Sequence, residues 1–241
     1  MFLKSIILAA VQFKIYMANL LDDEILDFLR KLRVPLRLPA GVEGLLPWTD
    51  PEVMRLCAAF YRKFYHDAGP RTLILGINPG RFGGGHTGIP FTDPIRLEQV
   101  CGIPNELNKR AELSSDFVYR VISAYGGPGK FYAKFFISSV SPVGYVQNGT
   151  NLNYYDRPDL KGLISEKAPG WLEKQLAFGL DRKVCFCFGE GKNLDFLREM
   201  NVRKGYFGEI IGLPHPRFVM QYRRKQLDDF ISRYVTALDA A

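Results

Sequence analysis

The chain has 241 residues, a length that a single α/β domain can reach and that is enough to bury a sizeable core. Its formal charge of +7 at pH 7 suits a polyanionic partner, although charge alone does not establish one. The 4 cysteines have neither zinc nor iron–sulfur spacing, so we expect no metal centre and no other cofactor. Scattered, unpaired cysteines favour a reducing cytoplasm as the location.

Residues 1–16 form an apolar segment that contains two lysines. Its apolar run, residues 6–13, is too short to span a membrane, and no clear small-residue cleavage site of a signal peptide follows it. We therefore interpret residues 1–16 as an N-terminal extension of doubtful role and residues 17–241 as a single domain. No membrane partner is expected.

The first part of the chain combines helical patterns with one buried strand. Apolar spacing predicts a helix over residues 20–33, which Asn19 can cap, and several prolines predict an extended connector over 34–47. The segment Thr49–Glu52 has the form of a capping box with proline in the first turn, so it begins a second predicted helix. A short apolar run bounded by glycine predicts a strand over 72–76.

The rest of the chain continues this alternation. Further strands are predicted over residues 132–138, 183–188 and 209–213, and further helices over about 115–125, 169–180 and 223–238. We interpret residues 144–156, which are rich in asparagine and tyrosine, as a loop. Because strands alternate with helices, the sequence predicts an α/β fold whose parallel sheet is covered by helices on both faces.

The strand over 72–76 leads into residues 76–91, which contain six glycines and two prolines. Glycine lets the backbone approach a ligand closely or adopt a positive φ. Loops at the carboxyl ends of parallel strands are where open α/β sheets place their binding sites. The segment has neither the glycine spacing of a dinucleotide-binding loop nor the Gly-Lys-Ser/Thr ending of a phosphate-binding loop. A nucleotide-binding Rossmann protein is therefore not favoured.

Two stretches of sequence resemble a known family. Residues 76–83, Gly-Ile-Asn-Pro-Gly-Arg-Phe-Gly, and residues 87–91, Thr-Gly-Ile-Pro-Phe, closely resemble motif 1 of the single-strand-selective monofunctional (SMUG-type) uracil-DNA glycosylases. Residues 213–216, Leu-Pro-His-Pro, resemble motif 2 of the wider uracil-DNA glycosylase superfamily. The resemblance, to a bacterial branch of the SMUG type, implies a three-layer α/β/α sandwich with a four-stranded parallel central sheet.

The same resemblance implies an activity. It points to a DNA glycosylase that hydrolyses the N-glycosidic bond of uracil, or of a 5-substituted uracil, and leaves an abasic site for base-excision repair. The motifs contain no lysine that could form a Schiff base, so we expect no lyase activity. The expected partner is uracil-containing DNA, single- or double-stranded, bound by a monomer in the bacterial cytoplasm.

The resemblance also implies roles for individual residues. Asn78 matches the residue that positions the attacking water, and His215 matches the residue that donates a hydrogen bond to O2 of the leaving base. An amide orients water but does not act as a real base at pH 7, so catalysis must rely on electrostatic stabilisation of the departing anion. Phe91 matches the aromatic residue that stacks on the extruded base. The expected substrate-binding residues are Gly80, Phe82, Gly84, Phe91 and Ser139.

Base specificity is where this sequence departs from the family. Gly80 leaves room where related families carry a bulky side chain that excludes 5-substituted pyrimidines. Ser139 stands where SMUG-type enzymes carry an asparagine that reads the O4 and N3 edge of uracil, and a hydroxyl cannot present the bidentate edge of an amide. Either the specificity is relaxed, or an asparagine from the following segment substitutes. The candidates are Asn148, Asn151 and Asn153.

Residues 216–225 take the place of the family's DNA-intercalating loop. The apolar side chains of Phe218 and Met220 are candidate wedges. The residues expected to contact phosphate are Lys192, Arg217, Arg223 and Arg224. Two other functions stay open: a glycosylase for xanthine or hypoxanthine on the same fold, and a catalytically silent protein that binds damaged or single-stranded DNA.

Overall fold

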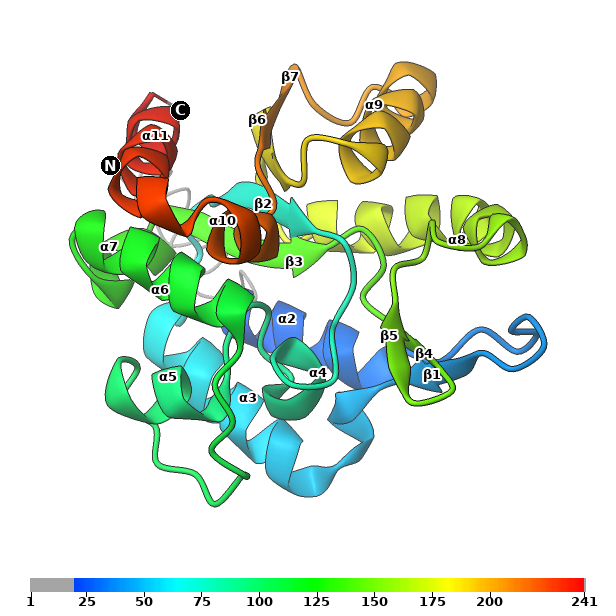
Figure 1. The fold of residues 1–241 in the computed structure, drawn as a ribbon, viewed down its shortest axis with the longest axis horizontal. Helices are drawn as coiled ribbons and strands as arrows, with labels where there is room; N and C mark the ends of the chain where they lie inside the picture. The colour runs from blue at the N-terminus through cyan, green and yellow to red at the C-terminus, as the bar shows by residue number, and fades with distance from the viewer. Residues whose placement is uncertain (1–19, 241) are drawn as a thin grey trace, which may run out of the picture.

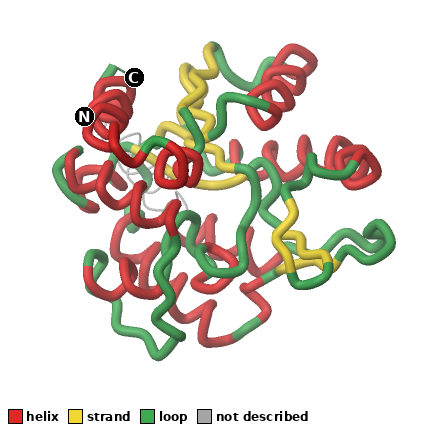
Figure 2. Tube along the Cα trace, viewed as in Figure 1, coloured by secondary structure: helices red, strands yellow, loops and turns green. Residues whose placement is uncertain are grey.

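The computed structural model describes residues 20–240, which form a four-stranded sheet that lies among helices and a small sheet at one edge of the molecule (Figures 1 and 2). The predicted extension over residues 1–16 and the predicted cap Asn19 lie outside the described residues. The strands are β1 (Glu43–Leu45), β2 (Thr72–Gly76), β3 (Phe135–Ser139), β4 (Gly144–Gln147), β5 (Thr150–Leu152), β6 (Asp181–Phe188) and β7 (Glu209–Leu213). The α-helices are α2 (Leu21–Lys31), α3 (Pro51–Phe64), α4 (Gly84–Thr87), α5 (Pro94–Gln99), α6 (Leu113–Ala124), α7 (Pro128–Tyr132), α8 (Pro158–Leu176), α9 (Lys192–Lys204), α10 (Pro216–Tyr222) and α11 (Leu227–Asp239), with 3₁₀-helices η1 (Pro47–Thr49) and η2 (Arg224–Gln226).

The larger sheet has four parallel strands in the order β3-β2-β6-β7, which confirms the predicted sheet. The register places Ile74 of β2 beside Ile137 of β3 and Phe186 of β6, so these three side chains share one face. On that face, Tyr234 of α11 packs against Phe188 of β6, with ring centroids 5.3 Å apart. Phe117 of α6 packs against Tyr234 in turn, with ring centroids 4.9 Å apart, so helices α11 and α6 cover this side of the sheet.

The opposite face is covered by α2 and the end of α8. Phe136 of β3 points away from Ile137 because successive side chains of a strand alternate. Its ring contacts Phe178, which follows α8, at a centroid distance of 6.1 Å. Phe178 in turn packs edge-on against Phe28 of α2 at 5.7 Å. The described helices thus lie on both sides of the sheet, as the predicted three-layer sandwich requires.

The small sheet was not predicted. Strands β1, β4 and β5 form an antiparallel sheet in the order β1-β4-β5, so β1 lies in the expected connector and residues 144–156 are not simply a loop. The β4–β5 turn consists of Asn148 and Gly149, which both have positive φ (48° and 70°). Asn-Gly is favoured in two-residue hairpin turns because both residues tolerate this conformation. The interpretation of the segment as a loop was therefore wrong.

Several predicted helix boundaries also change. Helix α8 begins at Pro158, 11 residues before the predicted start at 169, and Pro169 lies inside it. The predicted last helix, over residues 223–238, is α11 and begins at Leu227, and α10, which was not predicted, begins at Pro216. Both α8 and α10 have a proline in the first helical turn, where its missing N–H costs nothing. Asp50, not Thr49, caps α3 and accepts the Glu52 N–H at 2.8 Å.

Among residues 20–240, no helix is long and apolar enough to cross a membrane.

We predict that Phe186→Ala lowers the free energy of unfolding by about 3–5 kcal/mol, because it opens a cavity in the centre of the sheet. Phe186 is completely buried, whereas Leu36 is fully exposed. Leu36→Ala is the matched control and should change the stability by less than about 0.5 kcal/mol. Urea denaturation measures both. A loss below about 1 kcal/mol in Phe186→Ala would contradict this description of the core.

Candidate active site

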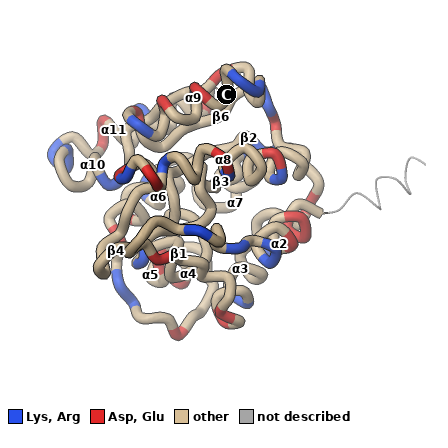
Figure 3. Tube along the Cα trace, turned by 90° about the vertical axis from the view of Figure 1, so that its right-hand side faces the viewer, with Lys and Arg blue, Asp and Glu red and all other residues tan. Residues whose placement is uncertain are grey.

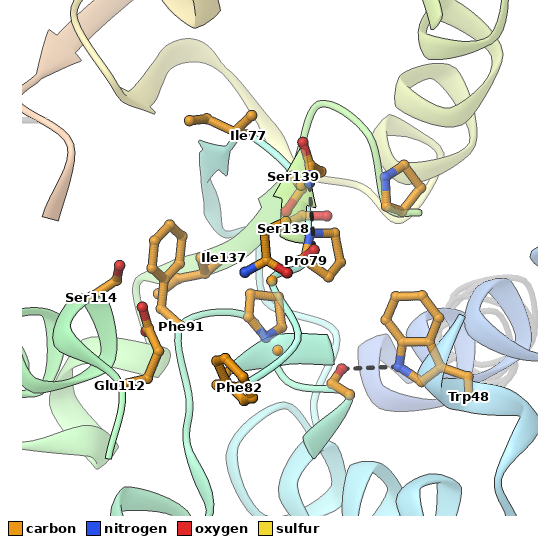
Figure 4. Close-up of a pocket in the computed structure, with 18 of the residues that line it drawn as sticks. Trp48, Ile77, Pro79, Phe82, Phe91, Glu112, Ser114, Ile137, Ser138 and Ser139 are labelled. Atoms are coloured by element: carbon orange, nitrogen blue, oxygen red, sulfur yellow. Dashed lines mark hydrogen bonds between the residues drawn. The ribbon is translucent and has the colours of Figure 1, made fainter. Parts of the chain in front are cut away.

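The carboxyl edge of the parallel sheet opens into a cavity of about 160 Å³ (Figure 4). Strand β2 ends two residues before Asn78, β3 ends at Ser139, and β7 ends two residues before His215. All three residues line the cavity. The other predicted substrate-binding residues, Gly80, Phe82, Gly84 and Phe91, line it as well. The fold thus brings every predicted catalytic and substrate-binding residue to one cavity.

The carboxamide of Asn78 is held by the backbone at the end of β5. Its Nδ2 donates to the carbonyl oxygen of Leu152 at 3.0 Å, and its Oδ1 accepts the backbone N–H of Tyr154 at 3.0 Å. Each bond contributes about 0.5–1.5 kcal/mol, and flipping the amide would lose both. A carboxamide oxygen accepts two hydrogen bonds, so Oδ1 keeps one position for a water molecule.

Tyr154 is itself anchored in the core. Its ring is fully buried, and its hydroxyl donates to Oδ1 of Asn193 on α9 at 2.8 Å. The Nδ2 group of Asn193 donates to Sγ of Cys187 on β6 at 3.2 Å. The backbone that orients Asn78 is therefore tied to the neighbouring strand of the parallel sheet.

Phe91 is held in an uncommon backbone conformation. Its φ is 51°, in the left-handed region, which costs a non-glycine residue about 1–2 kcal/mol. The ring packs against Phe188 at 5.5 Å and lies 6.0 Å from the ring of His215. It also covers Gly76 so closely that a Cβ there would lie 2.8 Å from the ring. These contacts fix the aromatic face that borders the cavity.

His215 is set up as a neutral hydrogen-bond donor. The backbone N–H of Arg217 donates to Nδ1 of His215 at 3.2 Å, so the proton of the neutral ring lies on Nε2. Burial, and next the positive charge of Arg217, lower the pKa of His215 to about 4. The hydroxyl of Tyr234 donates to the carbonyl of Pro214 and so holds the preceding backbone. At neutral pH the ring is therefore uncharged, with an oriented Nε2–H.

Phe82 lines the cavity, and two arginine side chains lie over its ring. The guanidinium carbons of Arg81 and Arg110 are 4.8 Å and 3.6 Å from its ring centroid, within cation–π range. Glu112 also lines the cavity, and its Oε2 accepts the backbone N–H of Ser115 at 2.8 Å. Sequence reasoning gave Arg81, Arg110 and Glu112 no role, because their positions depend on how α6 packs against the glycine-rich segment.

Two further structural supports were missed. Trp48 of η1 donates from Nε1 to the carbonyl of Gly88 at 2.9 Å and so anchors the glycine-rich segment (Figure 4). The β4–β5 hairpin supplies Asn151 and Leu152 to the cavity lining. The Asn-Gly turn was the signal that could have revealed the hairpin. Nothing in the local sequence indicates the Trp48 contact.

The predicted DNA-contacting residues lie mainly on α10 and just after it, where Lys and Arg residues gather (Figure 3). Arg217, Phe218, Arg223 and Arg224 are all exposed. The ring of Phe218 packs against that of Tyr222 at 5.6 Å, and these side chains are 42% and 62% exposed. Tyr222 was not among the predicted residues, although it stands one helical turn after Phe218.

The structure corrects the prediction that Met220 is a second wedge for insertion into DNA. It is only 3% exposed, because helical geometry turns it towards the core while Phe218 faces solvent. In this structure Met220 is therefore not available to DNA. Lys192 is exposed at the start of α9, with Nζ 5.9 Å from the ring of Tyr155, and it does not line the cavity.

Within residues 20–240, no group of three or more His, Cys, Asp or Glu side chains could hold a metal ion.

The sequence model of the Uracil DNA glycosylase superfamily matches residues 63–239. The crystal structure of wild-type Pedobacter heparinus SMUG2 superposes with a TM-score of 0.89 at 42% identity, and the match covers 92% of this chain and 97% of that chain. No protein among the curated sequences matches.

We predict that the His215 ring titrates with a pKa near 4 and stays neutral between pH 5 and 8. The ring's usual pKa is about 6.5, so as the pH falls from there towards 4 the unfolded chain takes up this proton first. The His215 contribution to stability therefore declines over that window. NMR of the three histidines checks the titration, with His66→Gln and His86→Gln assigning the other two signals. A His215 pKa above 6 would contradict the account.

Proposed function

Since this chain belongs to the uracil-DNA glycosylase superfamily and is a SMUG-type member of it, we propose that Asn78 and His215 carry out its glycosidic hydrolysis. The protein is a DNA glycosylase of base-excision repair. The observation that best supports the proposed roles is the fixed orientation of both side chains at one cavity. Asn78 offers a free acceptor position on Oδ1, and His215 offers a donor on Nε2.

In the proposed mechanism the target nucleotide leaves the base stack and its base enters the cavity. Extrusion costs a few kcal/mol, which stacking and hydrogen bonds in the pocket offset. The base stacks on Phe91, whose ring is already held by its neighbours. Asn78 Oδ1 then accepts a hydrogen bond from a water molecule and holds it near C1′ of the sugar. This positioning avoids the entropic cost of capturing a free water.

Bond cleavage separates charge between the sugar and the base. As the N-glycosidic bond breaks, its electron pair goes to the base, which leaves as an anion, and the sugar becomes oxocarbenium-like. Nε2–H of His215 donates to O2 of the departing base and stabilises the negative charge there. The water oxygen then bonds to C1′, and its proton is released to solvent. A neutral His215 suffices because it donates a hydrogen bond without transferring its proton.

We propose uracil and 5-substituted uracils as substrates, because Gly80 stands where related families carry a bulky side chain that excludes 5-substituted pyrimidines. Deaminated purines, xanthine and hypoxanthine, are the second candidates. The observation that favours them is Ser139, which is buried at the cavity and offers a hydroxyl in place of an amide. A hydroxyl rotates to donate or accept, so it tolerates more than one base edge.

We propose further that the enzyme acts without lyase chemistry, as a monomer in the cytoplasm. No lysine is found among the described residues that line the cavity, which supports simple hydrolysis. All 4 cysteines are free and buried, which suits a reducing compartment. The presence of both Asn78 and His215 at the cavity supports catalysis and disfavours a silent DNA-binding role.

We propose that two groups of side chains hold the DNA. In the first, Phe218 and Tyr222 form an exposed aromatic pair that suits insertion into the base stack. The guanidinium carbon of Arg223 lies 5.3 Å from the ring centroid of Phe218, and Arg217 and Arg224 stand next to these residues in the sequence, which suits contact with phosphate. In the second, Arg81 and Arg110 lie over Phe82, which lines the cavity. None of these arginines has an ion pair with a carboxylate among the described residues.

The proposed base specificity and the role of His215 are tested with one set of oligonucleotides. They carry uracil, 5-hydroxymethyluracil, xanthine, hypoxanthine or thymine, both single-stranded and paired, and alkali cleaves any abasic product. We predict that wild-type protein releases uracil and that His215→Ala is slower by roughly 100- to 1,000-fold, because it loses the donor to the leaving base. His86 does not line the cavity, so His86→Ala is the control and should match the wild type. Near wild-type activity in His215→Ala would reject the assigned role.

The proposed phosphate contacts predict a change in salt dependence. Each contact to single-stranded DNA contributes about −0.7 to the slope of log K against log salt concentration. Arg217→Ala and Arg224→Ala should each reduce the magnitude of that slope by about this amount and weaken binding to all sequences alike. Arg203 lies in the last turn of α9 and pairs with Glu199, so Arg203→Ala is the matched control. Fluorescence anisotropy measures binding, and an unchanged slope in both test variants would contradict the proposed surface.

A further inference from the structure

Asn151 lines the cavity, and only the oxygen of its carboxamide is hydrogen-bonded within the described residues. Its Oδ1 accepts the backbone N–H of Arg81 at 3.2 Å, which fixes which end of the amide is oxygen and which is nitrogen. Its Nδ2 lies 3.3 Å from the point where a Cβ on Gly80 would stand. That nitrogen has no hydrogen-bond partner among residues 20–240. The hairpin therefore presents an oriented, unused amide donor beside Gly80.

The two neighbouring asparagines do not offer the same group. Asn148 is exposed at the tip of the hairpin and does not line the cavity. Asn153 lines the cavity, but its Nδ2 donates to Oδ1 of Asp156 at 3.4 Å, and its backbone N–H donates to the same carboxylate at 2.8 Å. Asn151 alone among the three combines a fixed amide with a free donor.

We propose that Asn151 determines base specificity by donating a hydrogen bond from Nδ2 to the carbonyl oxygen that the base presents beside Gly80. This oxygen is O4 of uracil, or the C6 carbonyl oxygen of a deaminated purine. The inference rests on the proposed function and deepens it. Ser139 and Asn151 then share the reading of the base, a hydroxyl from β3 and an amide from β5, instead of one asparagine reading it alone.

The fixed orientation of the amide gives the contact its selectivity. Turning the amide over would place Nδ2 against the N–H of Arg81, so two donors would face each other. A base with an amino group at this position, as in cytosine or adenine, would likewise place its own N–H donors against the Nδ2 donor of Asn151. Repulsive pairings of this kind reject the wrong ligand as effectively as attractive contacts select the right one.

Asn151→Asp distinguishes the proposed hydrogen bond to the base from the hydrogen bond that Asn151 makes to the Arg81 backbone. The aspartate keeps an oxygen that accepts the Arg81 N–H and has the same size, but it removes the Nδ2 donor. Asn148→Asp adds the same charge at the exposed tip of the same hairpin and is the matched control. Single-turnover release is measured for each variant on single-stranded DNA with uracil and with 4-thiouracil, whose sulfur is a much weaker acceptor than O4.

The expected result is a loss of about 10-fold on uracil in Asn151→Asp, near the upper value of one neutral hydrogen bond. On 4-thiouracil the loss should be less than about 3-fold, because the bond is already weak there, and Asn148→Asp should match the wild type on both. Wild-type rates in Asn151→Asp on uracil would overturn the inference. Equal losses on both bases would also overturn it, since Asn151 would then act only through the loop or its charge. If the wild type releases no base at all, the proposed function fails and the inference fails with it.

Discussion

The orientation of the Asn78 amide depends on the junction between the two sheets. The parallel sheet brings Asn78 to the cavity, but the side chain is oriented by the backbone of the small sheet, through Leu152 and Tyr154. These two bonds decide which atom of the amide is the oxygen that, in the proposed mechanism, holds the attacking water. The small sheet is therefore part of the proposed active site. Its anchor through Tyr154 to Asn193 connects this orientation to the packing of α9 on the parallel sheet.

The same principle of fixing polar groups through the backbone applies to the leaving-group side. The N–H of Arg217 fixes the tautomer of His215. Burial, together with the positive charge of Arg217, lowers the pKa of His215 and keeps its ring neutral. Phe188 of β6 lies between the strands that deliver the two proposed catalytic residues, and its ring supports Phe91. The proposed site thus relies on oriented neutral dipoles in place of titrating acids and bases. Such groups stabilise a developing charge without reorganising during the reaction.

The sequence predicts well those features that follow from local pattern and strand topology. Short apolar runs predicted the four parallel strands, and the rule that their carboxyl ends share an edge placed Asn78, Ser139 and His215 together. The hairpin was missed because its strands are 4 and 3 residues long and carry little apolar alternation, although Asn148-Gly149 was a usable signal. Met220 was predicted as a wedge because the segment was interpreted as a loop. In the helix α10 the side chain of Met220 points into the core, whereas that of Phe218 points to solvent. Contacts such as Arg110 over Phe82 depend on tertiary packing and leave no trace in the local sequence.

The most direct test of the central claim is the single-turnover rate of uracil release by Asn78→Ala compared with the wild type, with DNA affinity measured in parallel. If the oriented amide of Asn78 holds the attacking water, the variant should bind uracil-containing DNA as tightly as the wild type and release uracil roughly 100-fold more slowly or worse. Release at the wild-type rate with unchanged affinity would show that the water is held elsewhere. That result would contradict the role proposed for the junction of the two sheets.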